Sequence, residues 1–381
     1  MTYADESAAL DAEILGVIDD WRHNRRMLAD DRFDALALRA FDYQFRYNAP
    51  YARYCVRLGF SSASTAASWH DIPAVPAAAF KEAVLATFDS STAALTFETS
   101  GTTAGRPGRH YFETPALYEA ALLAAFDRFV LPDGARLRYL NLVPNPAERP
   151  QSSLGYMMRH VSRHRAAGAT GWYLRGDRLA VEDFVADAQS AIHEGSPACI
   201  AATAFALANL LDALEQRNVL LPLPSGSRMM ETGGFKGRAR VVEREELYRR
   251  AGRLFGLPPQ AVLAEYGMTE LTSQYYDDAL LRNDDGPVDA RRKFAPPWLR
   301  ARVVAPDGSA VCNGTVGSLV HVDLANRSSC VAVATEDLGV QFGDNGGLVL
   351  IGRERGAALR GCSLDAESLR PLRDAGAPAS G

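Results

Sequence analysis

Between residues 95 and 265, short apolar runs alternate with longer segments of helical periodicity, and this alternation constrains the fold more than any other feature. The predicted strands cover residues 137–143, 199–203, 228–231 and 261–265. The helices predicted between and after them cover residues 153–165, 181–193, 205–217 and 243–255. Strands that alternate with helices build layers in which helices surround a largely parallel sheet. We therefore predict an α/β fold.

The flanking sequences differ from this central part. A chain of 381 residues is too long for one ordinary core, so subdomains are expected. Residues 1–70 have helical apolar spacing and predict an N-terminal helical packing region. Residues 71–295 form the predicted α/β core. Residues 296–381 contain short predicted strands between glycine and asparagine turns, which indicates a small β-rich subdomain with a truncated C-terminal segment.

Composition excludes several classes of function. The 41 Lys and Arg residues against 46 Asp and Glu residues give a net charge of −5 without a basic patch, so nucleic acid is not an expected partner. No apolar stretch reaches the ~20 residues of a membrane span. The N-terminus lacks the basic and apolar regions of a secretory signal, so we expect a cytoplasmic protein. Five scattered cysteines without a C-x-x-C pair argue against a disulfide framework or a zinc knuckle.

The first motif is a loop in which hydroxyl side chains alternate with glycines after a short apolar strand. Its candidate phosphate-binding residues are Thr99, Ser100, Gly101, Thr102, Thr103 and Gly105. Glycines let backbone amides approach a phosphate closely, and the hydroxyls donate hydrogen bonds to its oxygens. The loop is not a Walker A motif, because no Gly-Lys-Ser/Thr follows at the required spacing.

A second glycine-rich turn follows the predicted strand 228–231. Gly233 and Gly234 expose backbone groups that an adenine edge can use, and Phe235 offers a ring for stacking. Lys236 adds a cation near the phosphates. Taken alone, a turn with an incidental lysine explains this segment equally well.

A third motif, Tyr266-Gly267-Met268-Thr269-Glu270, lies at the end of the predicted strand 261–265. Ligands of α/β folds bind at the carboxyl ends of strands. Thr269 is placed to reach a phosphate. Glu270 is a candidate ligand for Mg²⁺, which prefers oxygen donors and often has only one or two protein carboxylates beside the phosphates of its substrate.

In order and spacing, these three motifs resemble those of the adenylate-forming superfamily, which includes acyl-CoA synthetases, luciferases and peptide-synthetase adenylation domains. Asp337 lies in a stretch similar to the ribose-binding motif of that superfamily, and Arg353 is similar to its hinge-side arginine. The resemblance implies a layered large domain, ATP and Mg²⁺ as cofactors, and nucleotide contacts from the residues named above.

Within the superfamily, the chain most resembles the acyl-protein synthetase (LuxE-type) branch and, more distantly, phenylacetate-CoA ligase. The resembling stretches are 72–76 with Phe80-Lys81, 152–157, 233–236 and 360–364. This resemblance implies that a carboxylic acid is activated as acyl-AMP with release of pyrophosphate. The acyl group then becomes a thioester on a C-terminal cysteine, here Cys362, for delivery to a partner enzyme.

Two departures from the superfamily pattern affect the expected catalytic groups. The phosphate loop usually ends in Gly-x-Pro-Lys, whereas Gly108 follows Pro107 here, so Arg106 and Arg109 are candidates to supply the charge. Only 381 − 353 = 28 residues follow Arg353, fewer than the ~40 that usually fold unaided, so the full lid domain with its lysine is expected to be missing. We therefore expect Lys236 or an arginine to stabilise the α-phosphate, with Thr269 and Cys362 as further catalytic residues.

Two alternatives remain open from the sequence. The acyl group can pass to an external acceptor, such as CoA, a carrier-protein thiol or an amine, with Cys362 as a packing residue. The chain can also be a non-catalytic nucleotide-binding protein. The acid itself, fatty or aromatic, is not readable from one sequence because pocket depth depends on tertiary contacts.

Overall fold

The computed structural model describes residues 2–99, 106–176, 178–233, 243–343, 346–353 and 370–371. The α-helices are α1 Tyr3–Asn24, α2 Asp30–Tyr47, α3 Ala49–Arg57, α4 Ala79–Glu82, α5 Ala116–Phe129, α6 Ser153–Arg165, α7 Val181–His193, α8 Ala204–Gln216, α9 Arg244–Phe255 and α10 Ala279–Arg282. The strands of the first half are β1 Val75–Pro76, β2 Leu95–Glu98, β3 Arg109–Phe112, β4 Leu137–Pro144, β5 Ala166–Arg175, β6 Arg178–Leu179 and β7 Ala198–Thr203. Those of the second half are β8 Arg228–Thr232, β9 Val262–Tyr266, β10 Tyr275–Asp277, β11 Lys293–Phe294, β12 Leu299–Val304, β13 Gly317–Asp323, β14 Ala332–Gln341, β15 Leu348–Arg353 and β16 Arg370–Pro371.

One large mixed sheet runs through the molecule, and β2 and β3 form a separate hairpin. Strands β5, β4, β7, β8 and β9 are neighbours in that order and pair in parallel. From β10 onward, β10, β11, β15, β14, β13 and β12 continue the sheet in antiparallel pairs. The predicted α/β fold with a β-rich C-terminal part is confirmed. The predicted boundaries at residues 70 and 295 stay predictions.

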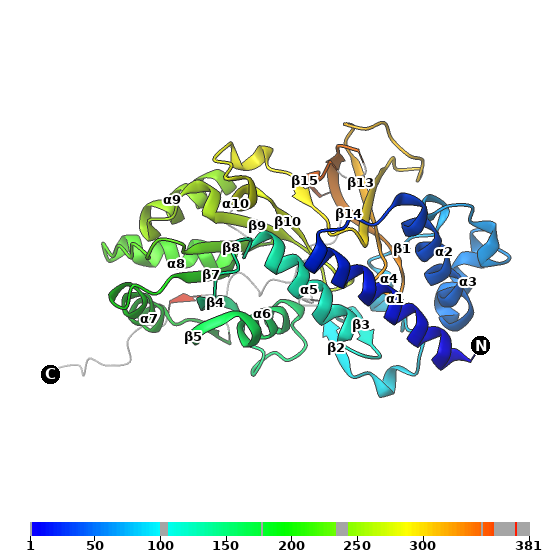
Figure 1. Ribbon diagram of the computed structural model, residues 1–381, viewed down its shortest axis with the longest axis horizontal. Coiled ribbons are helices and arrows are strands. Elements are labelled where there is room, and N and C mark those ends of the chain that lie inside the picture. Colours follow the sequence, from blue (N-terminus) through cyan, green and yellow to red (C-terminus); the bar gives the residue numbers. More distant parts are fainter. Residues whose placement is uncertain are drawn as a thin grey trace.

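Helices cover both faces of the parallel strands (Figure 1). Ile200 and Ala202 of β7 face a core shared with α7, α8 and α9, whereas Cys199 and Ala201 face the core shared with α1, α5 and α6. A strand buried on both faces is apolar throughout instead of alternating. This explains why β7 was recognisable as a continuous apolar run.

The N-terminal helices pack against the rest of the molecule through apolar and ionic contacts. Thr2 caps α1 with a capping box, in which its hydroxyl oxygen accepts from the Asp5 N–H and the Asp5 carboxylate accepts from the Thr2 N–H. The buried Arg327 joins Asp11 of α1, at 2.7 Å, to Glu113, at 2.6 Å. This ion cluster fixes α1 to the segment that follows β3. Among the described residues, no helix has both the length and the apolarity needed to cross a membrane.

Candidate functional site

The β2–β3 hairpin holds both ends of the predicted phosphate loop. The backbone N–H of Thr99 donates to the carbonyl of Gly108 at 2.9 Å, and the N–H of Gly108 donates to the Thr99 hydroxyl oxygen at 2.8 Å. Below this closing pair, Glu98 and Arg109 face each other in the antiparallel register. The Thr99 hydroxyl accepts a hydrogen bond and keeps its own proton for a ligand. The hairpin therefore fixes where the loop leaves and re-enters the fold.

His110 of β3 joins this hairpin to the third predicted motif. Its Nδ1 lies 2.9 Å from the carbonyl oxygen of Thr269, and both residues are buried. Burial lowers the pKa of His110 to about 4, so the ring is neutral at pH 7 and donates through Nδ1–H. The β2–β3 hairpin and the segment after β9 are thus held together.

The end of β9 brings two predicted nucleotide-binding residues into contact. The Tyr266 hydroxyl donates to the Asp337 carboxylate at 2.9 Å and lies 3.2 Å from Nε2 of His321. Nδ1 of His321 lies 2.8 Å from the hydroxyl of Tyr275. Because a carboxylate only accepts, the Tyr266 proton points to Asp337, and its oxygen accepts from Nε2–H of His321. Nδ1 then accepts from the Tyr275 hydroxyl.

Burial lowers the pKa of His321 to about 4, although the Asp337 charge opposes that shift. The imidazole is therefore neutral at pH 7, which agrees with one nitrogen that donates and one that accepts. Sequence reasoning missed His321. The available signal was a single histidine inside the apolar run of β13, which by itself also fits a packing role. The backbone of Arg353 is the register partner of Asp337 across β14 and β15. Two residues assigned to the nucleotide thus lie on adjacent strands.

The glycines around these strand ends have definite conformational roles. Gly233 has φ +77°, a left-handed conformation that favours glycine, directly after β8. At Gly267, a Cβ would lie 2.5 Å from Oε1 of Glu265, so only glycine leaves room for that carboxylate. The Thr232 hydroxyl donates to Glu265 and joins the ends of β8 and β9. Both predicted turns therefore lie at neighbouring strand ends.

A buried carboxylate, Asp323, organises the segment after Glu270. It accepts hydrogen bonds from the backbone N–H groups of Thr272, Ser273 and Ala325 and from the Ser273 hydroxyl. Burial raises the pKa of Asp323 to about 6, against the opposing effect of these hydrogen bonds. Sequence reasoning missed this residue, because its partners come from another part of the chain.

Asn326 fixes Glu270, the predicted magnesium ligand. Its Nδ2 donates to the Glu270 carbonyl and to the Cys330 carbonyl, each at 3.0 Å. Within the part of the chain that the structure describes, no group of three His, Cys, Asp or Glu side chains could hold a metal ion. The Glu270 carboxylate has the oxygen ligands that Mg²⁺ prefers. Its role as a magnesium ligand stays a prediction.

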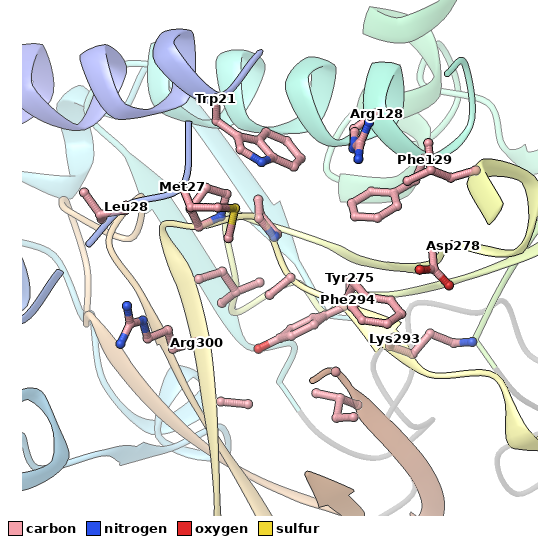
Figure 2. A pocket seen from close by; sticks show the side chains of 18 of the residues that line it. Trp21, Met27, Leu28, Arg128, Phe129, Tyr275, Asp278, Lys293, Phe294 and Arg300 are labelled. Carbon is pink, nitrogen blue, oxygen red and sulfur yellow. The ribbon is translucent and has the colours of Figure 1, made fainter. Parts of the chain in front are cut away.

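A cavity of about 540 Å³ lies on the sheet face that α1 and α5 cover. Figure 2 shows Trp21 and Phe129 from these helices on one side and Tyr275 and Lys293 on the other. Tyr275 also binds His321, so one side chain joins the cavity to the tyrosine–histidine–aspartate cluster. The cavity was not predicted from the sequence, because its walls come from segments far apart in the chain.

Several predicted site residues fall outside the described part of the chain. They are Ser100, Gly101, Thr102, Thr103, Gly105, Gly234, Phe235, Lys236 and Cys362. Among the predicted residues that are described, Thr99, Tyr266, Gly267, Met268 and Thr269 follow the ends of β2 or lie at the end of β9. The roles assigned to all these residues stay predictions.

The chain is similar to known proteins in sequence and in fold. The family described as "Acyl-protein synthetase, LuxE" matches residues 26–369. None of the curated proteins compared with the chain matches it in sequence.

Among solved structures, 2-hydroxyisobutyryl-CoA ligase in the postadenylation state, in complex with R3-HIB-AMP, is similar with a TM-score of 0.64 and 15% identity. The match covers 85% of this chain and 67% of that one. The open conformation of the same ligase, with 2-HIB-AMP and CoA, has a TM-score of 0.63 at 15% identity, over 85% of this chain and 69% of that one. At this identity, the likeness shows a shared fold. With the family match, it places the chain in the LuxE acyl-protein synthetase family, whose members are ATP-dependent, AMP-forming acyl ligases.

Proposed function

We propose that this enzyme activates a carboxylic acid with ATP and then transfers the acyl group to its own Cys362 as a thioester. The observation that carries the first step is the hydrogen bond between Tyr266 and Asp337, which brings the strand-end motif and the ribose motif together. The bond between His110 and Thr269 adds the phosphate-loop hairpin to the same site. Three motifs that are distant in sequence thus surround one strand end, where α/β folds bind ligands.

In the first step, a carboxylate oxygen attacks the α-phosphorus of ATP. The new bond joins that oxygen to phosphorus, and the bond to the bridging oxygen of the β-phosphate breaks. The electron pair leaves with pyrophosphate. The carboxylate is already ionised, so the step needs positioning and charge stabilisation and no general base. Hydroxyls of the phosphate loop, Thr269 and Lys236 are the proposed donors, and magnesium held by Glu270 would neutralise phosphate charge.

In the second step, the Cys362 thiolate attacks the acyl carbonyl. A carbon–sulfur bond forms, the bond between the carbonyl carbon and the phosphate oxygen breaks, and AMP leaves. The proton lost from the thiol passes to solvent. An unperturbed thiol with a pKa near ~8.5 is only about 3% ionised at pH 7, so this step benefits from nearby cations.

Three of the four described cysteines are buried and are poor nucleophiles. Burial raises the pKa of Cys55 and of Cys199 to about 12, and it raises the pKa of Cys330 further. Cys312 is exposed, between β12 and β13. Cys312 therefore serves as the matched control for Cys362.

An external acceptor is the second candidate. The structurally similar 2-hydroxyisobutyryl-CoA ligase was solved with an acyl-AMP and CoA together, which favours CoA as the alternative thiol. In that case, Cys362 would be a packing residue. A partner enzyme that accepts the acyl group is expected only if the thioester forms on Cys362.

Intact-protein mass spectrometry tests these readings. The wild type, Cys362→Ser and Cys312→Ser are incubated with ATP, magnesium and a panel of aliphatic and aromatic acids. We expect one acyl adduct in the wild type and in Cys312→Ser, absent from Cys362→Ser and released by hydroxylamine. Pyrophosphate release without any adduct would assign an external acceptor. ATP binding without pyrophosphate release for any acid would indicate a non-catalytic nucleotide-binding protein.

A further inference from the structure

A basic hollow of about 470 Å³ lies beside the base of the phosphate-loop hairpin. The cations among its lining residues are Lys81, Arg106 and Arg109. Glu82 is the only carboxylate among the residues that line it, all of which are described. The lining therefore carries an excess of positive charge.

Helix α4 packs on β3, and its Lys81 lines this hollow. The buried ring of Phe80 lies 5.6 Å from the ring of His110, centroid to centroid, and anchors α4 on the inner face of β3. Successive residues of a strand point to opposite faces. Arg109 and Tyr111 therefore line the hollow, while His110 faces inward toward Thr269.

Lys81 lies directly against the closing pair of the loop. A Cβ on Gly108 would lie 3.2 Å from Cγ2 of Thr99 and 3.3 Å from Cγ of Lys81. The stem of the lysine thus packs where the loop begins and ends. The superfamily's loop lysine would follow Pro107, at the position of Gly108. The stem of Lys81 therefore packs beside the position where that lysine is missing.

The three cations differ in whether a carboxylate already pairs with them. Arg109 forms an ion pair with Glu98 at 2.9 Å. Within the described part of the chain, no ion pair or hydrogen bond joins the side chain of Lys81 or of Arg106 to another residue. Their charges are therefore available to an anion that enters beside the loop.

We propose that Lys81, assisted by Arg106, binds the β- and γ-phosphates of ATP and the pyrophosphate that leaves. This inference rests on the proposed adenylation. When the bond between the α-phosphorus and the bridging oxygen breaks, the electron pair stays on pyrophosphate, and a cation beside that oxygen stabilises the growing charge. The lysine replaces the missing loop cation from a helix that precedes the loop in sequence.

The phosphates of CoA have the same chemistry as those of ATP, so the experiment separates the two sources. Calorimetry with magnesium pyrophosphate as the probe compares the full-length wild type with Lys81→Ala, Lys81→Arg and Arg106→Ala. Arg57→Ala, an exposed cation on α3, is the matched control. AMP, which lacks the pyrophosphate portion, is titrated into each variant in parallel.

We expect Lys81→Ala to weaken pyrophosphate binding about tenfold or more, because a charge-assisted contact is lost. Arg106→Ala should weaken it less, Lys81→Arg should restore most of it, and Arg57→Ala should change nothing. AMP affinity should stay the same in all variants. In acid-dependent turnover, Lys81→Ala should raise the KM for ATP and lower kcat.

Four results would overturn the proposal. The first is wild-type protein that binds no pyrophosphate, and the second is Lys81→Ala protein that binds it as tightly as the wild type. The third is an equal loss of AMP and pyrophosphate affinity in Lys81→Ala. The fourth is a raised KM for CoA in Lys81→Ala with unchanged pyrophosphate binding. Failure of the adenylation proposal gives a different pattern. In that case no acid releases pyrophosphate, while pyrophosphate binding still depends on Lys81.

Discussion

The hydroxyl of Tyr266 donates a 2.9 Å hydrogen bond to the carboxylate of Asp337, although 71 residues separate the two in sequence. The bond crosses from the end of β9 to β14 and is buried. His321 supports it from the other side by donating to the Tyr266 oxygen. One hydroxyl therefore connects two motifs assigned to the nucleotide and sets their separation.

Replacing Tyr266 with Phe should weaken both folding and ATP use. The substitution leaves the Nε2–H of His321 without its acceptor and Asp337 without its donor, which costs about 1–3 kcal/mol of the free energy of unfolding. If Asp337 binds the ribose, the KM for ATP should rise several-fold. Denaturant unfolding and acid-dependent pyrophosphate release measure the two effects.

Tyr276→Phe is the matched control, because Tyr276 is fully buried on the same strand as Tyr275. Among the described residues, its hydroxyl has one hydrogen-bond partner, the sulfur of Met157 at 3.9 Å. We expect this control to change the free energy of unfolding by less than about 1 kcal/mol. Equal effects of both variants on unfolding and on the KM for ATP would show that the bond between Tyr266 and Asp337 does not position the motif.

The buried His110 should make the protein less stable as the pH falls. Its pKa is about 4 in the folded state and 6.5 as the ordinary value, so the unfolded chain binds more protons between these pH values. The stabilisation is therefore complete above pH 6.5 and is lost as the pH falls toward 4. At pH 5, this single group should lower the free energy of unfolding by about 2 kcal/mol relative to pH 8.

His110→Asn isolates this effect, because an asparagine Nδ2–H can still donate to the Thr269 carbonyl. The variant loses ring packing and should be less stable at every pH. The fall of its unfolding free energy between pH 8 and pH 5 should nevertheless be smaller than in the wild type. An unchanged fall would mean that His110 is already protonated in the folded protein at pH 5.

The parallel part of the sheet was predictable because both of its faces are buried. Strands such as β7 and β9 are apolar runs that end in turn residues, and these patterns depend on local sequence. Strand β5, Ala166–Arg175, was missed because it begins with alanine, glycine and threonine and is partly exposed. Its strand conformation comes from parallel pairing with β4, a long-range contact.

Site residues were predictable only where the local sequence determines the backbone conformation. Gly233 and Gly267 indicated turns because glycine has a local steric role. Strand β14 runs from Ala332 to Gln341, longer than the short strands expected beyond residue 296, so Asp337 lies within a strand that pairs on both sides. His321, Asp323 and Lys81 were not assigned, because their roles depend on partners from distant segments.

Asn326→Ala should loosen the segment that contains Glu270. The side chain of Asn326 donates to the Glu270 and Cys330 carbonyls and accepts from the backbone N–H of Thr272 at 2.8 Å. Its removal takes one donor from each of two buried carbonyls and one acceptor from the Thr272 N–H, which keeps its hydrogen bond to Asp323. This loss should cost about 2–4 kcal/mol of unfolding free energy. If Glu270 binds magnesium, the magnesium concentration for half-maximal pyrophosphate release should rise.

Asn313→Ala is the control for that substitution, because Asn313 is exposed and accepts one hydrogen bond, from the Gly343 N–H at 2.8 Å. Its cost should stay below about 1 kcal/mol. A magnesium requirement that is the same in both variants would argue against Glu270 as the metal ligand. The unfolding measurement would still report whether Asn326 stabilises the segment.

Asp11→Asn should detach α1 far more than a substitution two residues along the helix. Both oxygens of Asp11 accept from the fully buried Arg327 at 2.7 Å, so the variant leaves a buried guanidinium paired only with Glu113. Glu13→Gln on the same helix removes an exposed pair with Arg39 instead. We expect a loss of about 3 kcal/mol of unfolding free energy for the first and below about 1 kcal/mol for the second. Hydrogen exchange should localise the first loss to α1, and equal losses would mean that Arg327 is solvated when it lacks Asp11.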